Sequence, residues 1–205
     1  MVKNYTEALR DAKSAVSLEK KLSKGWLRIT RCCVKLGDTI SARKALRKLN
    51  HLGEDDIYEK SNIEEIERLE ELSLLAKNCN DYKTSLCSIK EALKIAKSSA
   101  NLKRSLVECL VLLGRIKEAK TVIESLSKTD LSDNSSSYVK GLCLYYEGTD
   151  MAEAIILFKQ IPTIDPSHRK AKEILSVSWV DPILASILYT LTYHPELLES
   201  RGSES

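Results

Sequence analysis

The sequence is poor in the residues that shape β-structure and tight turns. Its 205 residues include only seven glycines, four prolines and one phenylalanine, and aromatic residues make up 5% of the chain. Sandwiches and barrels need frequent turn residues and many β-branched or aromatic side chains. Leucine, alanine, lysine and glutamate, which favour helices, are abundant instead. The composition therefore favours an all-α protein.

The sequence also lacks the motifs that carry most enzyme and metal chemistry. Its six cysteines show no C-x-x-C spacing, and there is no glycine-rich phosphate loop. His51, His168 and His194 have no acidic or cysteine partner at the spacing of a metal site or a catalytic triad. We therefore expect no enzymatic activity, no cofactor and no metal. Cys32 and Cys33 are interpreted as packing residues in a reducing environment.

Charge is small overall but unevenly distributed. The formal net charge is +3. Residues 1–50 hold 13 Lys/Arg against 4 Asp/Glu, a balance of +9, whereas residues 51–72 hold 2 against 9, a balance of −7. The acidic stretch, which includes EEIERLEEL, is typical of a solvated helix face. The basic half leaves RNA as a minor alternative, but without interleaved aromatic residues we expect no nucleic-acid partner.

A structural repeat runs through the chain. The segments YTEALRDAKSAV, TISARKAL, YKTSLCSIKEAL, IKEAKTVI and MAEAIILFKQI share a small residue followed by apolar positions every three or four residues. The small residues are separated by 34, 43, 34 and 35 positions, and 34 is the tetratricopeptide (TPR) period. This pattern predicts an all-α TPR helix-turn-helix solenoid that winds as a right-handed superhelix. The small residues are Ala8, Ala42, Ser85, Ala119 and Ala154.

Other residues fit the same scheme. Gly37 in LGD and Gly114 in LGR follow apolar helical stretches, and the residue just past a helix often needs a positive φ. Gly141 fits the small position of a first helix, where two helices approach closely. The residues expected in the core of the last full repeat are Tyr145, Tyr146 and Phe158.

The repeat pattern divides the chain into an array and a tail. Residues 57–65 are extra residues that we expect to lengthen the helix that follows. The apolar run after about residue 176 contains Asp181 and Pro182, so an amphipathic cap or an unstructured tail is favoured over a membrane span. The predicted TPR array covers residues 1–176, with a half repeat at 1–22, repeats at 23–56, 66–99, 100–133 and 134–168, and the start of a further helix at 169–176; residues 177–205 form a divergent C-terminal tail.

Several segments resemble a co-chaperone family. NYTEALRDAKSAVSLEKKLSKGWLRITRCCVKLGD, VECLVLLGRIKEA, YVKGLCLYYEG and DPSHRKA look like the TPR region of the DnaJ homologue subfamily C co-chaperones. The resemblance implies a cytoplasmic adaptor, with the nucleus as a second compartment, that binds the acidic EEVD tails of heat-shock protein 70 and heat-shock protein 90. The family stimulates an ATPase through the HPD tripeptide of a J domain. The nearest string here is YHPELL, so we expect a relative that lacks the J domain.

Four cations lie in line on one predicted helix. In SKGWLRITRCCVKLGD they step by four, three and four residues, which places them on one helical face. The resemblance implies that Lys24 and Arg28 stand at two of the five positions of a clamp for a C-terminal carboxylate. Arg31 and Lys35 would extend the groove along the same face. The other clamp residues, one lysine and two asparagines, would lie upstream of Met1, so we expect a half clamp with weakened binding. The alternative is a solvated basic face without a ligand.

A different interpretation is a TPR scaffold with no chaperone-tail binding. The first helix lacks a partner within its own repeat, so it must pack on the second repeat alone and leave one flank exposed. That flank is available for self-association or for another chain. The residues of the first helix expected to pack are Tyr5, Ala8, Leu9, Ala12, Val16 and Leu18.

Overall fold

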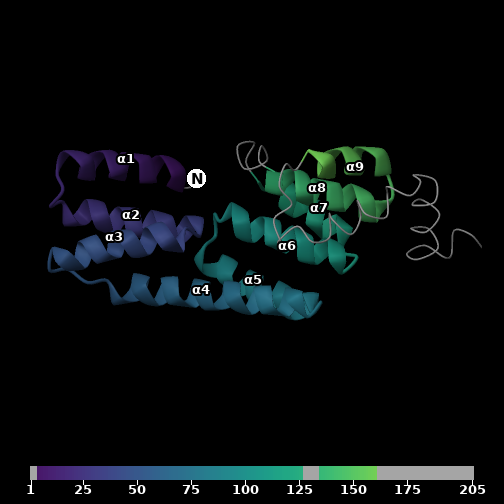
Figure 1. Cartoon of the computed structure of the whole chain (residues 1–205). Coiled ribbons are helices and arrows are strands. Elements are labelled where there is room, and N and C mark those ends of the chain that lie inside the picture. Colours follow the sequence, from purple (N-terminus) through teal and green to yellow (C-terminus); the bar gives the residue numbers. More distant parts are fainter. Residues whose placement is uncertain (1–3, 127–133, 161–205) are drawn as a thin grey trace, which may run out of the picture. The chain divides into compact units, whose positions relative to one another are not determined.

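The structure, a computed structural model, describes residues 4–126 and 134–160. Within these ranges it consists of nine α-helices and no β-strand (Figure 1). The all-α prediction is therefore confirmed for this part of the chain. The helices form two compact units, α1–α7 and α8–α9. They are α1 (Tyr5–Leu18), α2 (Ser23–Leu36), α3 (Thr39–His51), α4 (Ile57–Asn78), α5 (Tyr82–Ile95), α6 (Ala100–Leu112), α7 (Ile116–Glu124), α8 (Asn134–Glu147) and α9 (Met151–Lys159).

Each helix of the first unit packs against the helix that follows it. Short turns join them, so the chain reverses at the end of each helix and returns alongside the previous one (Figure 1). In the second unit, α8 and α9 form a pair of the same kind. The helix α2 contacts α1, α3 and α4, so it is packed against three helices.

Small residues mark the places where paired helices approach each other. Their spacing along the sequence is that of the predicted repeat. The alanine of the first segment, Ala8, is half-buried. The other four are 0% exposed, which confirms that these positions are packed: Ala42, Ser85, Ala119 and Ala154.

Ser85 and Gly141 show in detail how helices approach each other closely. The buried hydroxyl of Ser85 lies 2.8 Å from the hydroxyl of Ser73 and 3.3 Å from Sγ of Cys109, so its hydrogen-bonding capacity is satisfied. In α8, a Cβ added at Gly141 would lie 2.6 Å from Cε1 of Phe158. This confirms that Gly141 occupies a position where only a hydrogen atom fits.

The helix ends follow simple rules. Asp38 begins α3 and Asp56 begins α4, each by accepting a hydrogen bond from the backbone N–H three residues further on, at 2.9 and 3.0 Å. At the other ends, Gly37 follows α2 with a φ of 75° and Gly114 follows α6 with a φ of 73°. Both predicted helix-terminating glycines are confirmed.

Helix α1 packs on α2 through one stripe. Ala12 and Val16 are buried, and Tyr5 and Leu9 are half-buried. Leu18 is 91% exposed, so the expectation that it packs on the next repeat is wrong. Leu18 lies two residues after Val16, which turns it about 200° around the helix and away from the stripe.

Residues 57–65 form the N-terminal part of α4, a single helix of 22 residues. The acidic side chains of α4 are not all solvated. Glu64 and Glu71 are exposed, as a solvated face requires, but Glu67 is half-buried and forms an ion pair with Arg43 of α3. The interpretation of this stretch as a purely solvated face is therefore too simple, because α4 packs against α3 as well as α5.

The aromatic residues of α8 and α9 differ in burial. Phe158 is 1% exposed and its ring centroid lies 6.3 Å from that of Tyr138, so its place in the core is confirmed. Tyr145 and Tyr146 are half-buried, and their rings meet edge to face at 5.4 Å. None of the helices in residues 4–126 and 134–160 has the length and apolarity to cross a bilayer. The predicted helix start at 169–176, the tail at 177–205, His168 and His194 lie outside the described residues.

Candidate peptide-binding surface on α2

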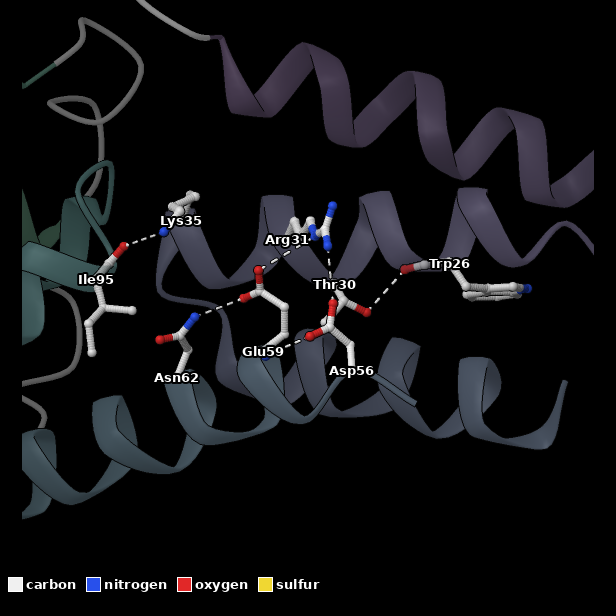
Figure 2. A network of polar contacts seen from close by, with 8 residues as sticks. All are labelled: Trp26, Thr30, Arg31, Lys35, Asp56, Glu59, Asn62 and Ile95. Atoms are coloured by element: carbon white, nitrogen blue, oxygen red, sulfur yellow. Dashed lines mark hydrogen bonds and ion pairs between the residues drawn. The ribbon is translucent and has the colours of Figure 1, made fainter. Parts of the chain in front are cut away.

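The four cations of α2 fall into two pairs that differ in their contacts. The C-terminal pair, Arg31 and Lys35, is held by other parts of the chain (Figure 2). The side chains of the N-terminal pair, Lys24 and Arg28, are exposed and make no ion pair or hydrogen bond with the residues that the structure describes. The two pairs therefore differ in how available they are to bind a ligand.

Arg31 is held by two carboxylates at the start of α4. Its Nη2 lies 3.2 Å from Oδ2 of Asp56, and its Nε lies 3.6 Å from Oε1 of Glu59. The Glu59 side chain is 5% exposed, and its other oxygen accepts a hydrogen bond from the amide of Asn62 at 3.2 Å. Figure 2 shows Arg31 pointing towards both carboxylates. This arginine serves first to neutralise a buried acid of its own chain.

Lys35 is directed to the end of another helix. Its Nζ donates a hydrogen bond to the main-chain oxygen of Ile95, the last residue of α5, at 3.1 Å (Figure 2). A helix C-terminus carries partial negative charge and unpaired carbonyl oxygens, so a lysine is favoured there. The N–H of Ser98 in turn donates to the main-chain oxygen of Lys35 at 2.9 Å. Lys35 thus ties α2 to the segment that joins α5 and α6.

Lys24 and Arg28 lie one turn apart on α2 and face solvent. Two like charges at this spacing repel each other by about 0.2–0.5 kcal/mol when no anion lies between them. Arg28 can hold a carboxylate through two parallel hydrogen bonds, whereas Lys24 acts as a single positive point. Together they offer an anion a pair of unengaged donors. Their role in carboxylate binding stays a prediction.

The opposite faces of α2 are packed. The buried hydroxyl of Thr30 donates to the main-chain oxygen of Trp26 at 3.0 Å (Figure 2). Cys33 is 0% exposed, and burial, with a smaller effect of Asp38, raises the pKa of its thiol to about 11. Burial also raises the pKa of Cys32, although the nearby Arg28 opposes the shift. Both cysteines pack as expected and neither is activated as a nucleophile.

Sequence reasoning did not identify the partners of Arg31 and Lys35. A signal for the first was present, because the +9 half of the chain is followed at once by the −7 segment. Asp56 and Glu59 are also three residues apart, which is the spacing of a helix N-cap residue and an acid in the first turn of the helix. The contact of Lys35 with a main-chain oxygen sixty residues away leaves no trace in composition or local spacing.

No other cluster of catalytic or metal-binding groups competes with this surface among the residues described. No group of three His, Cys, Asp or Glu residues in 4–126 and 134–160 is arranged to hold a metal ion. The six cysteines, all within these ranges, are free thiols. His51 is exposed at the end of α3. Of the ion pairs elsewhere, Lys77 of α4 pairs with Glu108 of α6, whereas Arg68 with Glu65 and Lys94 with Glu91 are local pairs within one helix.

The fold is that of a TPR protein. The chain superposes on the crystal structure of the TPR domain of P58(IPK) with a TM-score of 0.60, over 95% of this chain and 62% of that one, at 16% sequence identity. The predicted all-α TPR solenoid is therefore confirmed as a fold class. No protein-family model matches the sequence.

Sequence relatives agree with the fold. The chain is 29% identical over 174 residues to DnaJ homolog subfamily C member 7 of Homo sapiens and of Mus musculus, covering 83% of this chain and 35% of each relative. It is 23% identical over 169 residues to the DnaJ homolog subfamily C member 7 homolog of Dictyostelium discoideum, covering 81% of this chain and 31% of that one. The predicted resemblance is thereby confirmed. The chain spans about a third of the length of these relatives, and the comparisons support a TPR protein-interaction module.

Proposed function

We propose that the chain is a non-enzymatic TPR adaptor that binds the acidic C-terminal tails of heat-shock protein 70 and heat-shock protein 90 type chaperones, or their clients. One observation carries this proposal: Lys24 and Arg28 are adjacent, exposed and unpaired on α2, within the part of the chain that the structure describes. The similarity to DnaJ homolog subfamily C member 7 supports a chaperone-related role. We also propose a cytoplasmic or nuclear location, because the six free thiols suit a reducing compartment.

The chemistry of the pair suits a terminal carboxylate. A hydrogen bond to a charged partner contributes about 1.5–3 kcal/mol. Two such contacts, without further anchoring, correspond to dissociation constants of roughly tens of micromolar to a few millimolar. Because the pair is exposed, salt will weaken the binding strongly. Arg31 contributes less to a ligand, since Asp56 and Glu59 already hold it.

The test is a fluorescence titration of the full chain with a labelled peptide that ends in EEVD, at two salt concentrations. Arg28→Ala should weaken binding by about 10- to 100-fold, the equivalent of one charged contact. Lys90→Ala, an equal change of charge at an exposed position of α5, is the matched control and should leave binding intact. Amidation removes the terminal carboxylate of the peptide. The amidated peptide should therefore bind the native chain no more tightly than the free-acid peptide binds the Arg28→Ala variant. No salt-sensitive binding at millimolar peptide would refute the proposal.

A TPR scaffold without tail recognition is a second candidate. The exposed Leu18 of α1 supports it, together with a surface cavity of about 500 Å³ beside Leu9, Arg10 and Lys13. Self-association through this flank depends on apolar contact, so it should respond little to salt. Sedimentation velocity over a range of concentrations distinguishes the two candidates. A dimer that Leu9→Glu abolishes favours the scaffold.

A further inference from the structure

A second basic surface lies between α1 and α3. The C-terminal half of α1 and most of α3 form the two sides of a groove of about 900 Å³, and α2 contributes to its floor together with them. Helices α1 and α3 run in the same direction on either side of α2 (Figure 1). None of the four stripe cations of α2 lines this groove. It is therefore distinct from the surface formed by Lys24 and Arg28.

The sides of the groove are cationic. Lys13 lies on α1 and Lys20 in the turn that follows it, and the basic residues of α3 follow one another at steps of three, one and three. The row on α3 extends about 10 Å along its helix. No aspartate or glutamate lines the groove. The basic residues on its two sides are Lys13, Lys20, Lys44, Arg47, Lys48 and His51.

These cations have no partner within the described part of the chain. The five Lys and Arg side chains are exposed and form no ion pair or hydrogen bond with residues 4–126 or 134–160. This contrasts with Arg31 and Arg43, which pair with carboxylates of α4. Like charges on one helix face repel each other. An anionic ligand in the groove would turn that repulsion into attraction.

The floor of the groove is apolar. Val16, Ile29 and Ala45 contribute buried aliphatic surface. The indole of Trp26 also lines the groove, and its Nε1 donates to the main-chain oxygen of Lys20 at 2.9 Å, which fixes the ring. A ligand that fits must therefore be apolar along its centre and acidic along both edges.

An amphipathic helix with acidic flanks has this distribution. Helix-in-groove recognition uses apolar residues at i, i+3, i+4 and i+7, and two turns of such a helix match the length of the cationic row on α3. A nucleic acid matches less well. Its phosphates gain nothing from an aliphatic floor, and Trp26 alone offers a ring on which a base could stack.

We infer that the groove between α1 and α3 is a docking site for an acidic amphipathic helix of a partner protein. The site lies on a different face of α2 from Lys24 and Arg28. The chain can therefore hold a helical partner and an acidic C-terminal tail at the same time. This gives the module two independent interaction surfaces.

The experiment is a fluorescence anisotropy titration of the full chain with a labelled peptide of 14 residues. The peptide is acetylated and amidated, with leucines at i, i+3, i+4 and i+7 and glutamates on both flanks. Lys44→Glu/Lys48→Glu should weaken binding at least tenfold. Lys83→Glu/Lys90→Glu, an equal change of charge on exposed residues of α5, should change it less than twofold. Arg28→Ala should leave it unchanged.

Three results would overturn the inference. The first is unchanged binding in the Lys44→Glu/Lys48→Glu variant. The second is equal or tighter binding of a glutamate-only peptide or a short single-stranded RNA, which would indicate a general polyanion surface. The third is a concentration-dependent dimer that the same variant abolishes, because a second copy would then occupy the groove. Far-UV circular dichroism checks that the variant is folded, and Lys44→Ala/Lys48→Ala replaces it if it is not.

Discussion

Nη2 of Arg31 lies 3.2 Å from Oδ2 of Asp56, and the other carboxylate oxygen of Asp56 begins α4 by accepting the N–H of Glu59. One aspartate therefore serves two helices. It caps α4 and joins the start of that helix to the middle of α2 (Figure 2). The basic half of the sequence and the acidic segment after it meet inside the same chain at this point.

Arg31→Ala should lower the free energy of unfolding by about 1–2 kcal/mol. Removal of one partner from a fully buried ion pair costs about 3–5 kcal/mol, because the other charge stays buried without compensation. Glu59 is buried here, but the Arg31 side chain is 56% exposed, so solvent reduces the effect. Urea denaturation followed by circular dichroism measures the loss. Arg31→Ala/Glu59→Gln should recover part of it, and equal stability of Arg31→Ala and the native chain would contradict the argument.

The order of effects on tail binding is a separate prediction. Arg28→Ala should weaken binding of an EEVD peptide most and Lys24→Ala next, because a guanidinium offers two donors and an ammonium only one directed charge. Arg31→Ala should change it least, less than threefold, since Asp56 and Glu59 occupy that side chain. Isothermal titration of the three variants gives the order. A dominant effect of Arg31 would mean that the ligand displaces the carboxylates of α4.

Much of the fold could be predicted from the sequence, because it depends on local spacing. The small residues Ala42 and Ala119 and the terminating glycines Gly37 and Gly114 repeat at fixed distances, and each has one physical role. The expectation that Leu18 packs on the next repeat is wrong, and helical geometry alone is enough to exclude that packing.

The site was less accessible to sequence reasoning. A stripe of cations is visible in the spacing, but its division into engaged and unengaged pairs depends on which distant groups approach it. Arg31 reaches Asp56, and Lys35 reaches the main-chain oxygen of Ile95. The groove between α1 and α3 joins residues of three helices and has no single sequence pattern. Only the packing of the helices brings these groups together.

Alanine substitution should distinguish two glycines with the same backbone conformation. Gly37→Ala and Gly114→Ala each place a side chain at positive φ, which costs about 1–2 kcal/mol. At Gly114 nothing lies within 4 Å of the added Cβ, whereas at Gly37 it would lie 2.7 Å from Cβ of Ser99 and against its hydroxyl. Ser99 also caps α6, and loss of a cap lowers the free energy of unfolding by about a further 0.5–2 kcal/mol.

We therefore expect Gly37→Ala to lower the free energy of unfolding by about 1.5–4 kcal/mol and Gly114→Ala by about 1–2 kcal/mol. Chemical denaturation of both variants in parallel measures the difference. Similar losses would show that the Ser99 side chain moves aside without loss of its cap.

Thiol reactivity should divide the six cysteines into two groups. Cys79 and Cys87 are exposed, and the other four are buried. Burial raises the pKa of Cys33 to about 11 and also raises the pKa of Cys109, so neither forms much thiolate near pH 8. About two thiols should react quickly with a chromogenic disulfide in the native chain, and the remainder only after denaturation. Alkylation of Cys33 at the native rate of Cys87 would contradict the packing of α2.

The half-buried carboxyl of Glu70 should make stability depend on pH. Desolvation, with a smaller effect of the Glu67 carboxylate, raises the pKa of Glu70 in the folded chain. Between its ordinary and its raised pKa the folded state binds more protons than the unfolded state, so the contribution of Glu70 to stability increases as the pH falls through that window. At neutral pH the charged carboxylate destabilises the fold.

Glu70→Gln removes this charge while it keeps the shape of the side chain. The variant should be more stable than the native chain at pH 7, by less than about 1 kcal/mol, and its advantage should shrink as the pH falls towards the ordinary pKa of glutamate. Glu71→Gln, the exposed neighbour on α4, controls for the loss of one negative charge. Thermal unfolding of the three proteins at pH 7 and at pH 5 measures the effect. A Glu70→Gln variant less stable than the native chain at pH 7 would mean that the carboxylate is held by a favourable contact, and the burial argument would then fail.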